Sequence, residues 1–379
     1  MNLRDPRVRF YAMFPAAKIG TCATMWPSAR VVASVAASAV ALVVALILPA
    51  LILLAQGHAL AQSAAPTPLR FSFEWRLEGP MAFLLLPQDR NYYRQEGVDL
   101  SFDESGNALE AITRVASGSH NLGIADINTL ISYRDRNPTA PVKSIFMVYN
   151  RPPFSVVARK SRRITDPKLL EGKKLGAAPA GATLGIWPVF AKLNGIDAGK
   201  VTIEEVNNLV RIPMLAAGQI DGTLGFTFRD YVDFKDRGVP VDDIVLLHMP
   251  DYGLKTYGSA IIVNSKFAAE KPEAIKGFLR ALLRGLKETV SNPTSAIDSV
   301  VKRDDMERKE IELERLIIAI RDNVVTPEVR ANGYGAIDPM RFEEMMSQLA
   351  LAQTFKARPK MEDIFDGAFL PPAADRKVH

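Results

Sequence analysis

The stretch RVASGSHNLGIAD, residues 114–126, carries the pattern that decides the fold. Its helical part runs into Gly118, a residue type common at helix C-termini, and the apolar residues 122–125 are typical of a strand. The same order returns in PMLAAGQIDGTLG, residues 213–225, with Gly218 in the place of Gly118. Two similar lobes are therefore predicted. The alternative is that the two stretches share only the common order of helix, glycine and strand.

Strands and helices alternate on both sides of this stretch. Predicted strands cover 98–102, 122–125, 154–158, 175–178, 201–206, 221–225 and 260–263, and predicted helices cover 108–116, 127–134, 184–193 and 211–217. After residue 263 the chain is mainly helical. Such alternation favours βαβ units, so we predict an α/β fold in which each lobe is a mainly parallel sheet flanked by helices.

The N-terminal region contains an uncharged apolar run at residues 31–55. Arg30 precedes the run, and Ala59-Leu60-Ala61 offers the small-x-small pattern of a signal peptidase site before Gln62. We therefore expect residues 1–61 to be a signal peptide, with its functional part near 25–61, and the mature protein to be periplasmic. An uncleaved membrane anchor is the alternative.

Composition restricts the function further. Residues 1–61 hold five of the 47 Lys and Arg and one of the 42 Asp and Glu, so 42 basic and 41 acidic residues follow them. A nearly neutral mature chain gives no reason to expect nucleic-acid binding. Cys22, the single cysteine, lies in the leader, so the mature fold has to rest on its apolar core. His120, His248 and His379 are scattered, and no metal site or cofactor is expected.

The stretch FSFEWRLEGPMAF, residues 71–83, contains the first candidate site residues. A short alternating strand ends before a Gly-Pro turn, and Glu74, Trp75, Glu78 and Met81 lie around that end. One interpretation is a core strand with a buried tryptophan; the other makes this loop a wall of a binding site. General acid or base catalysis by the Glu74 and Glu78 pair is the less favoured hypothesis.

A small-residue turn in GAAPAGATLGIWPVF, residues 176–190, contains the next candidates. A predicted strand ends at Ala178, and a helix is expected to begin at Thr183. The N–H groups of the first turn would then meet a polar ligand atom, and small side chains would let the ligand reach the backbone. The candidates are Ala180, Gly181, Ala182 and Thr183; the alternative is an ordinary tight turn with Thr183 as the N-cap.

Polar and aromatic residues also follow other predicted strands. In open α/β sheets ligands bind beyond the carboxyl ends of the strands, so these loops are expected to converge on one cleft between the lobes. Arg151 and Arg229 could pair there with a ligand carboxylate or sulfonate, or they could be surface charges. The candidates from these loops are Asp126, Asn128, Arg151, Phe226, Arg229 and Tyr257.

Five segments resemble one family in the order expected for it. They are EWRLEGPMAFLLLPQDRNYYRQEGVDLSF, SGSHNLGIAD, LEGKKLGAAPAGATLG, LAAGQIDG and VNSKFAAEKPEAIKGFLRAL. Together the segments cover roughly residues 69–290. They resemble the solute-binding components of ABC importers. Within these, the chain is similar to the nitrate, sulfonate, taurine and thiamine-precursor branch of the type II periplasmic binding protein fold.

The resemblance implies two lobes that close over a small ligand and deliver it to a permease and its ATPase subunits. It implies a monomer with lobe one at 62–158 and 262–379, lobe two at 159–261, and hinges near Ala158 and Ile261. The implied ligand is a pyrimidine-like molecule, a sulfonate or an aromatic carboxylate. A membrane-anchored sensing domain of the same fold is the alternative.

The resemblance also limits the ligand and the chemistry. Glu74 and Trp75 match the Asp-Trp pair that opens thiamine pyrimidine-binding members, but Leu77, Glu78 and Met81 replace the Pro, Asn and His of those members. The related pyrimidine synthases require a cysteine-rich motif and a histidine. A mature chain without cysteine is therefore expected to be a binding protein and not an enzyme.

Overall fold

The computed structural model describes residues 65–303 and 308–378. The predictions for residues 1–61, a signal peptide or an anchor, lie outside this part of the chain. Within it, no helix combines the length and the apolar character needed to cross a membrane.

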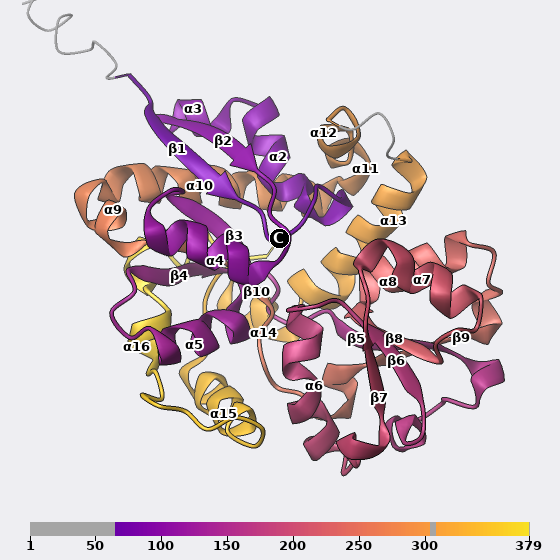
Figure 1. Ribbon diagram of the computed structural model, residues 1–379. Helices are drawn as coiled ribbons and strands as arrows, with labels where there is room; N and C mark the ends of the chain where they lie inside the picture. Colours follow the sequence, from indigo (N-terminus) through magenta and orange to yellow (C-terminus); the bar gives the residue numbers. More distant parts are fainter. Residues whose placement is uncertain (1–64, 304–307, 379) are drawn as a thin grey trace, which may run out of the picture. The chain divides into compact units, whose positions relative to one another are not determined.

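Lobe one is built on a five-stranded sheet with the order β2-β1-β3-β10-β4 (Figure 1). β1 runs parallel to both β2 and β3, whereas β10 runs antiparallel to β3 and β4. The strands are β1 (Thr67–Ser72), β2 (Val98–Asp103), β3 (Leu122–Asp126), β4 (Val142–Met147) and β10 (Ser259–Asn264). The flanking helices are α2 (Ala82–Asp89), α3 (Tyr92–Gln95), α4 (Ala108–Ser117), α5 (Ile127–Arg136), α9 (Ser265–Glu270), α10 (Pro272–Ser291) and α16 (Met361–Ile364).

Lobe two repeats this topology with the order β7-β6-β8-β5-β9. Its one antiparallel strand is β5, which lies between β8 and β9. The strands are β5 (Phe154–Arg159), β6 (Lys174–Ala177), β7 (Thr202–Glu205), β8 (Gly222–Phe226) and β9 (Ile244–His248), and the helices are α6 (Ala182–Leu193), α7 (Asn208–Ala216) and α8 (Thr227–Asp236). The predicted α/β fold with two mainly parallel sheets is confirmed.

The chain passes from lobe one to lobe two at residues 148–153 and returns at residues 249–258. The expected hinge positions, Ala158 and Ile261, lie inside β5 and β10. β5 pairs with β8 and β9 of the second sheet, and β10 pairs with β3 and β4 of the first. The crossing segments that connect the two sheets are thus 148–153 and 249–258, and the position of the hinges stays a prediction.

One arginine of the C-terminal region joins the two crossing segments. The Arg341 guanidinium donates to the carbonyl oxygens of Asn150 and Thr256, both at 2.8 Å. It also pairs with Glu328 at 2.8 Å and lies 3.9 Å from the ring centroid of Tyr257. A single planar group with several donors therefore connects both crossings with the C-terminal helices.

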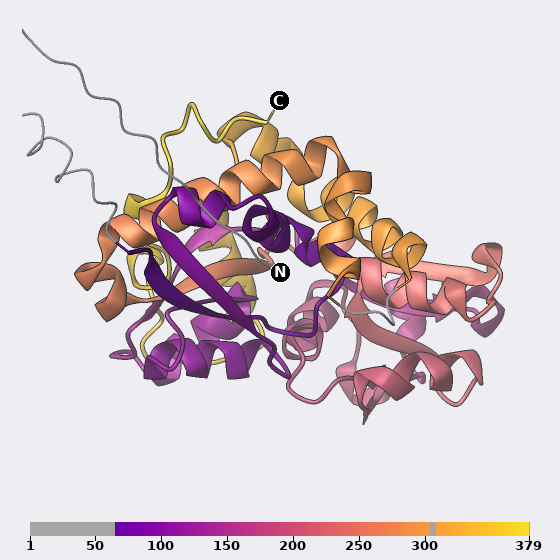
Figure 2. The same cartoon turned by 90° about the horizontal axis from the view of Figure 1, so that it is seen from above.

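The C-terminal helices contact both lobes. They are α11 (Pro293–Ala296), α12 (Asp298–Val301), α13 (Lys309–Ala319), α14 (Pro327–Asn332) and α15 (Pro339–Leu349). In Figures 1 and 2, α13 lies beside α8 of lobe two, and it also packs against the 3-10 turn Gly79–Met81 of lobe one. Arg315 of α13 forms ion pairs with Asp233 of α8 and with Glu312 of its own helix.

Gly79 allows the close contact between the loop after β1 and α13. A Cβ atom at this position would lie 1.9 Å from the carbonyl oxygen of Glu312, which is far inside van der Waals contact. The Gly79 N–H also donates to the Glu312 carboxylate. Because Gly79 has no side chain, the loop that carries Glu74, Trp75 and Glu78 packs directly against α13.

Gly79→Ala is expected to lower the free energy of unfolding by about 1–3 kcal/mol, because the new methyl group displaces α13. Gly185→Ala is the matched control. Gly185 lies within α6 with open space around its Cβ position, and alanine there is expected to be stabilising by about 0.5–1 kcal/mol. Urea denaturation of both variants checks this, and equal effects would contradict the packing argument.

Candidate ligand-binding site

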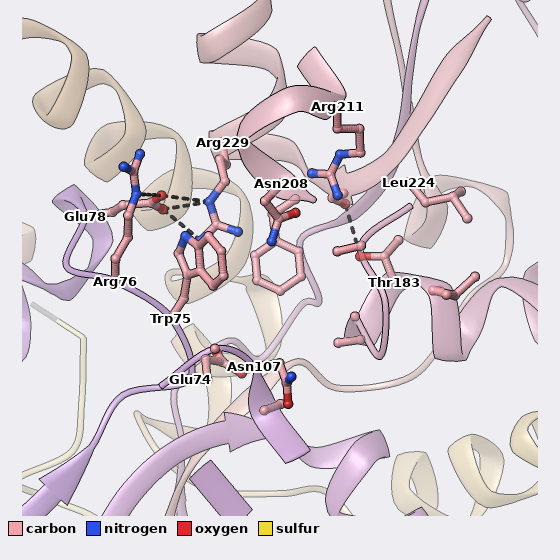
Figure 3. A pocket seen from close by; sticks show the side chains of 18 of the residues that line it. Glu74, Trp75, Arg76, Glu78, Asn107, Thr183, Asn208, Arg211, Leu224 and Arg229 are labelled. Atoms are coloured by element: carbon pink, nitrogen blue, oxygen red, sulfur yellow. Dashed lines mark hydrogen bonds and ion pairs between the residues drawn. The ribbon is translucent and has the colours of Figure 1, made fainter. Parts of the chain in front are cut away.

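A cavity of about 180 Å³ is lined by residues of both lobes (Figure 3). Lobe one contributes the loop after β1 and the start of α4, and lobe two contributes the starts of α6, α7 and α8. Both sets of residues follow the carboxyl ends of parallel strands, which is where open α/β sheets bind ligands.

Aromatic side chains form one wall of the cavity. The Arg229 guanidinium lies 5.4 Å from the ring centroid of Trp75 and 5.4 Å from that of Phe226, so it supports both rings. The indole Nε1 of Trp75 is buried and has no hydrogen-bond partner among the described residues. Because a buried donor without a partner is costly, this atom is suited to a ligand acceptor.

Glu78 joins the lobes beneath this wall. Both oxygens of its buried carboxylate accept from the Arg229 Nε–H, at 2.9 and 2.8 Å, and Nη2 of Arg229 lies 2.8 Å from Oε2. Burial by itself raises the pKa of Glu78, but the positive charges of Arg229 and Arg315 outweigh it and hold that pKa below its ordinary value. Arg229 is therefore already paired within the protein, and it is neither a surface charge nor a free partner for a ligand anion.

Glu74 faces protein groups. Its carboxylate accepts hydrogen bonds from the Ser259 hydroxyl at 2.5 Å and from the Asp126 backbone N–H at 3.0 Å. Burial raises its pKa to about 7, and the nearby Asp126 carboxylate adds to the effect. Glu74 therefore connects β10 and β3 of the same lobe beside the cavity.

Four helices begin at the cavity. The side chains of Asn107 and Asn207 cap α4 and α7, whereas α6, with Gly181 as its N-cap residue, and α8 have no side-chain cap. Thr183 is not the N-cap: it lies in the first turn, and its hydroxyl donates to the Gly225 carbonyl at 3.3 Å. The first N–H groups of α6 therefore have no capping side chain and can meet an oxygen atom of a ligand.

The structure brings most of the candidates together, but not all of them. Those that line the cavity are Glu74, Trp75, Glu78, Met81, Gly181, Ala182, Thr183, Phe226 and Arg229. Ala180, Asp126 and Asn128 line a second cavity on the other side of the 179–184 turn. Arg151 pairs with the exposed Asp251, and Tyr257 is buried beneath Arg341, so we do not retain these two as ligand-binding residues.

The sequence reasoning did not select several residues that line the cavity. They are Phe73, Asn107, Tyr149, Asn208, Arg211, Leu224 and Phe228. Asn107 could have been found from the sequence, since an asparagine directly before a predicted helix is a typical N-cap residue. Tyr149 also had a signal in the sequence, because it lies beside Asn150 and Arg151 in a loop at a strand end. Its hydroxyl is buried without a hydrogen-bond partner among the described residues.

Metal binding finds no support in the described residues. Across 65–303 and 308–378, no group of three or more His, Cys, Asp or Glu is arranged to hold a metal ion. His120 instead contacts Asp103, and His248 contacts the Pro152 carbonyl.

Two sheets of this topology, with a cavity lined from both, define the type II periplasmic binding protein class. The chain belongs to the family described as NMT1/THI5 like, which it matches over residues 80–296. The structure resembles the alkanesulfonate-binding protein from Xanthomonas axonopodis pv. citri bound to MOPS, with a TM-score of 0.61 and 13% identity over 80% of this chain and 99% of that one. The periplasmic nitrate-binding protein of Synechocystis PCC 6803 is similar, with a TM-score of 0.61 and 11% identity over 80% of this chain and 87% of that one.

Related sequences include both binding proteins and enzymes. A riboflavin-binding protein of Chloroflexus aurantiacus is 27% identical over 55% of this chain and 58% of its own. A 4-amino-5-hydroxymethyl-2-methylpyrimidine phosphate synthase of Schizosaccharomyces pombe is 23% identical over 55% of this chain and 62% of its own. A formylaminopyrimidine-binding protein of Halalkalibacterium halodurans is 24% identical over 77% of this chain and 87% of its own. The chain thus spans less than two thirds of the first two relatives.

The raised pKa of Glu74 predicts a pH dependence of stability. Between 4.5 and about 7 the folded protein holds a proton that the unfolded chain has released, so stability is lost as the pH rises through this window. Relative to Glu74→Gln, wild type is expected to lose up to about 1.4 kcal/mol per pH unit there. Chemical denaturation of both proteins at pH 5, 6, 7 and 8 checks this, and parallel curves would refute it.

Arg229→Met is expected to lower the free energy of unfolding by about 3–5 kcal/mol, because it leaves the Glu78 carboxylate buried without its main partner. Arg229→Met combined with Glu78→Leu is expected to regain most of the loss. Arg237→Met, at an exposed position just after α8, is the matched control. Thermal unfolding of wild type, these three variants and Glu78→Leu alone measures the coupling, and simple additivity of the two single substitutions would contradict it.

Proposed function

We propose that the protein is an extracytoplasmic solute-binding protein that holds a flat heteroaromatic molecule in the cavity and delivers it to an ABC importer. The observation that carries this is the aromatic wall of Trp75 and Phe226, together with the buried indole donor of Trp75, which has no hydrogen-bond partner in the described part of the chain. A planar ring stacks on such a wall, and a ring nitrogen or carbonyl accepts from the indole. The buried Tyr149 hydroxyl offers a second polar contact.

The charge balance of the cavity favours a neutral ring over a sulfonate or a carboxylate. Arg229 is neutralised by Glu78, and the buried Arg211 pairs with Asp230 at 2.7 and 2.9 Å. Arg76 lies 3.4 Å from Glu78, and its side chain is 42% exposed. A negatively charged ligand would have to compete with these internal carboxylates for its partners.

Two relatives support the same ligand class, because their names state that they bind riboflavin and a formylaminopyrimidine. A binding role without catalysis is supported by the position of the histidines: neither His120 nor His248 lines the cavity, and the single cysteine is Cys22. If the protein converted a bound pyrimidine into a product, this would instead indicate an enzyme with the activity of the synthase relatives.

Export is supported by the apolar run at 31–55 and by Ala59-Leu60-Ala61 after it. The mass of the mature protein tests this part separately. A chain that begins near Gln62 is a periplasmic component that reaches the permease of the importer by diffusion. A chain that keeps 31–55 is the membrane-anchored alternative.

Trp75→Ala is expected to weaken the binding of an aromatic heterocycle by about tenfold to a hundredfold, because it removes the stacking surface. Trp187→Phe is the control, since Trp187 is buried in α6 and does not line the cavity. Thermal-shift screening of pyrimidines, flavins, sulfonates and nitrate comes first, followed by isothermal titration of the hits. Tight binding of a sulfonate or nitrate that is unaffected by Trp75→Ala would refute the proposed ligand class.

A further inference from the structure

A second cavity, of about 570 Å³, lies on the other side of the turn at 179–184. It is lined by α5 of lobe one, by α6 of lobe two and by the segment after α15. It shares Gly181, Ala182 and Leu184 with the first cavity. The turn that begins α6 is thus a wall common to both.

Asn128, which lines this second cavity, has a buried acceptor that is not used. Its side-chain nitrogen donates to the Asp126 carboxylate at 3.0 Å and to the Tyr257 carbonyl at 2.9 Å. Both amide hydrogens are therefore used and the amide orientation is determined, since an oxygen in that place would face two acceptors. The residue is only 6% exposed, and its Oδ1 has no partner among the described residues.

Gln353 supplies an unused donor to the same cavity. Its Oε1 accepts from the Ser132 hydroxyl at 3.2 Å, which leaves the nitrogen to donate elsewhere. Nε2 is buried and has no partner among the described residues. An unused acceptor and an unused donor on one cavity match a hydroxyl group, which both donates and accepts.

The charges of the second cavity favour a neutral group. Asp126 and Asp135 are opposed by Arg136 and Lys356. Asp135 already accepts from the backbone N–H groups of Lys356, Ala357 and Arg358 at 2.7–3.0 Å. Neither a strong anion nor a strong cation would therefore find an unbalanced partner there.

We propose that the ligand has two parts: a planar ring in the first cavity and a hydroxylated chain that crosses the Gly181–Ala182 turn into the second. This inference rests on the proposed function and specifies its ligand. Gly181 and Ala182 line both cavities and carry the smallest side chains of the wall that the cavities share, and the uncapped start of α6 offers N–H groups to an oxygen atom of the chain. Asn128 and Gln353 then bind a hydroxyl group farther along.

The test uses matched pairs of compounds, a bare ring and the same ring with a hydroxylated chain: lumichrome with riboflavin, and uracil with uridine. Isothermal titration of the mature protein is expected to show at least tenfold tighter binding for one chain-bearing member than for its bare ring. Gln353→Leu and Asn128→Ala are each expected to reduce this advantage by about three- to tenfold and to leave bare-ring binding unchanged. Gln219→Leu, the same substitution at an exposed position, is the matched control.

The outcomes separate the two proposals. Equal affinity within each pair, or equal losses for ring and chain-bearing compound in Gln353→Leu, would overturn the two-part ligand and leave the ring site intact. A melting-temperature measurement of each variant shows whether it is folded, and Gln353→Leu, at a partly exposed position, carries the test if Asn128→Ala unfolds. If no member of any pair binds, the two-part ligand fails together with the proposed ring site.

Discussion

The bond between Glu78 and Arg229 is the interaction on which the site depends. It joins the loop after β1 in lobe one to α8 in lobe two; the Glu78 side chain is 2% exposed and the Arg229 side chain is 15% exposed. A buried carboxylate is tolerated only with a paired cation, so the two lobes have to meet at this point. Arg315 of α13 adds a second positive charge to Glu78, which gives the C-terminal helices a part in the same arrangement.

The same pair determines the character of the cavity. Because Arg229 is used by Glu78, its remaining role is to support the faces of Trp75 and Phe226. Arg229 thus forms part of an aromatic platform and is already paired with Glu78. Within the shared family fold, we therefore propose recognition by stacking and by hydrogen bonds to neutral groups.

Much of the fold could be predicted because its signals are local. The helix, glycine and strand order around Gly118 and Gly218 identified two similar sheets, and the loops after strands identified nine of the 24 residues that line the cavity. The lobe boundaries were not predictable in this way. β5 and β10 look like ordinary strands in sequence, and only their pairing partners show that each belongs to the sheet on the far side of a crossing.

The sequence by itself determined the α/β class, the family and the loops that carry the site, since periodicity, turn residues and segment order are properties of neighbouring residues. Tertiary structure alone decided what each polar side chain does. Arg229 and Arg151 are equivalent candidates in sequence, yet one supports the aromatic wall and the other pairs at the surface. The physical reason is that hydrogen bonds and ion pairs depend on partners far away in the chain, such as Glu78 for Arg229 and Ser259 for Glu74.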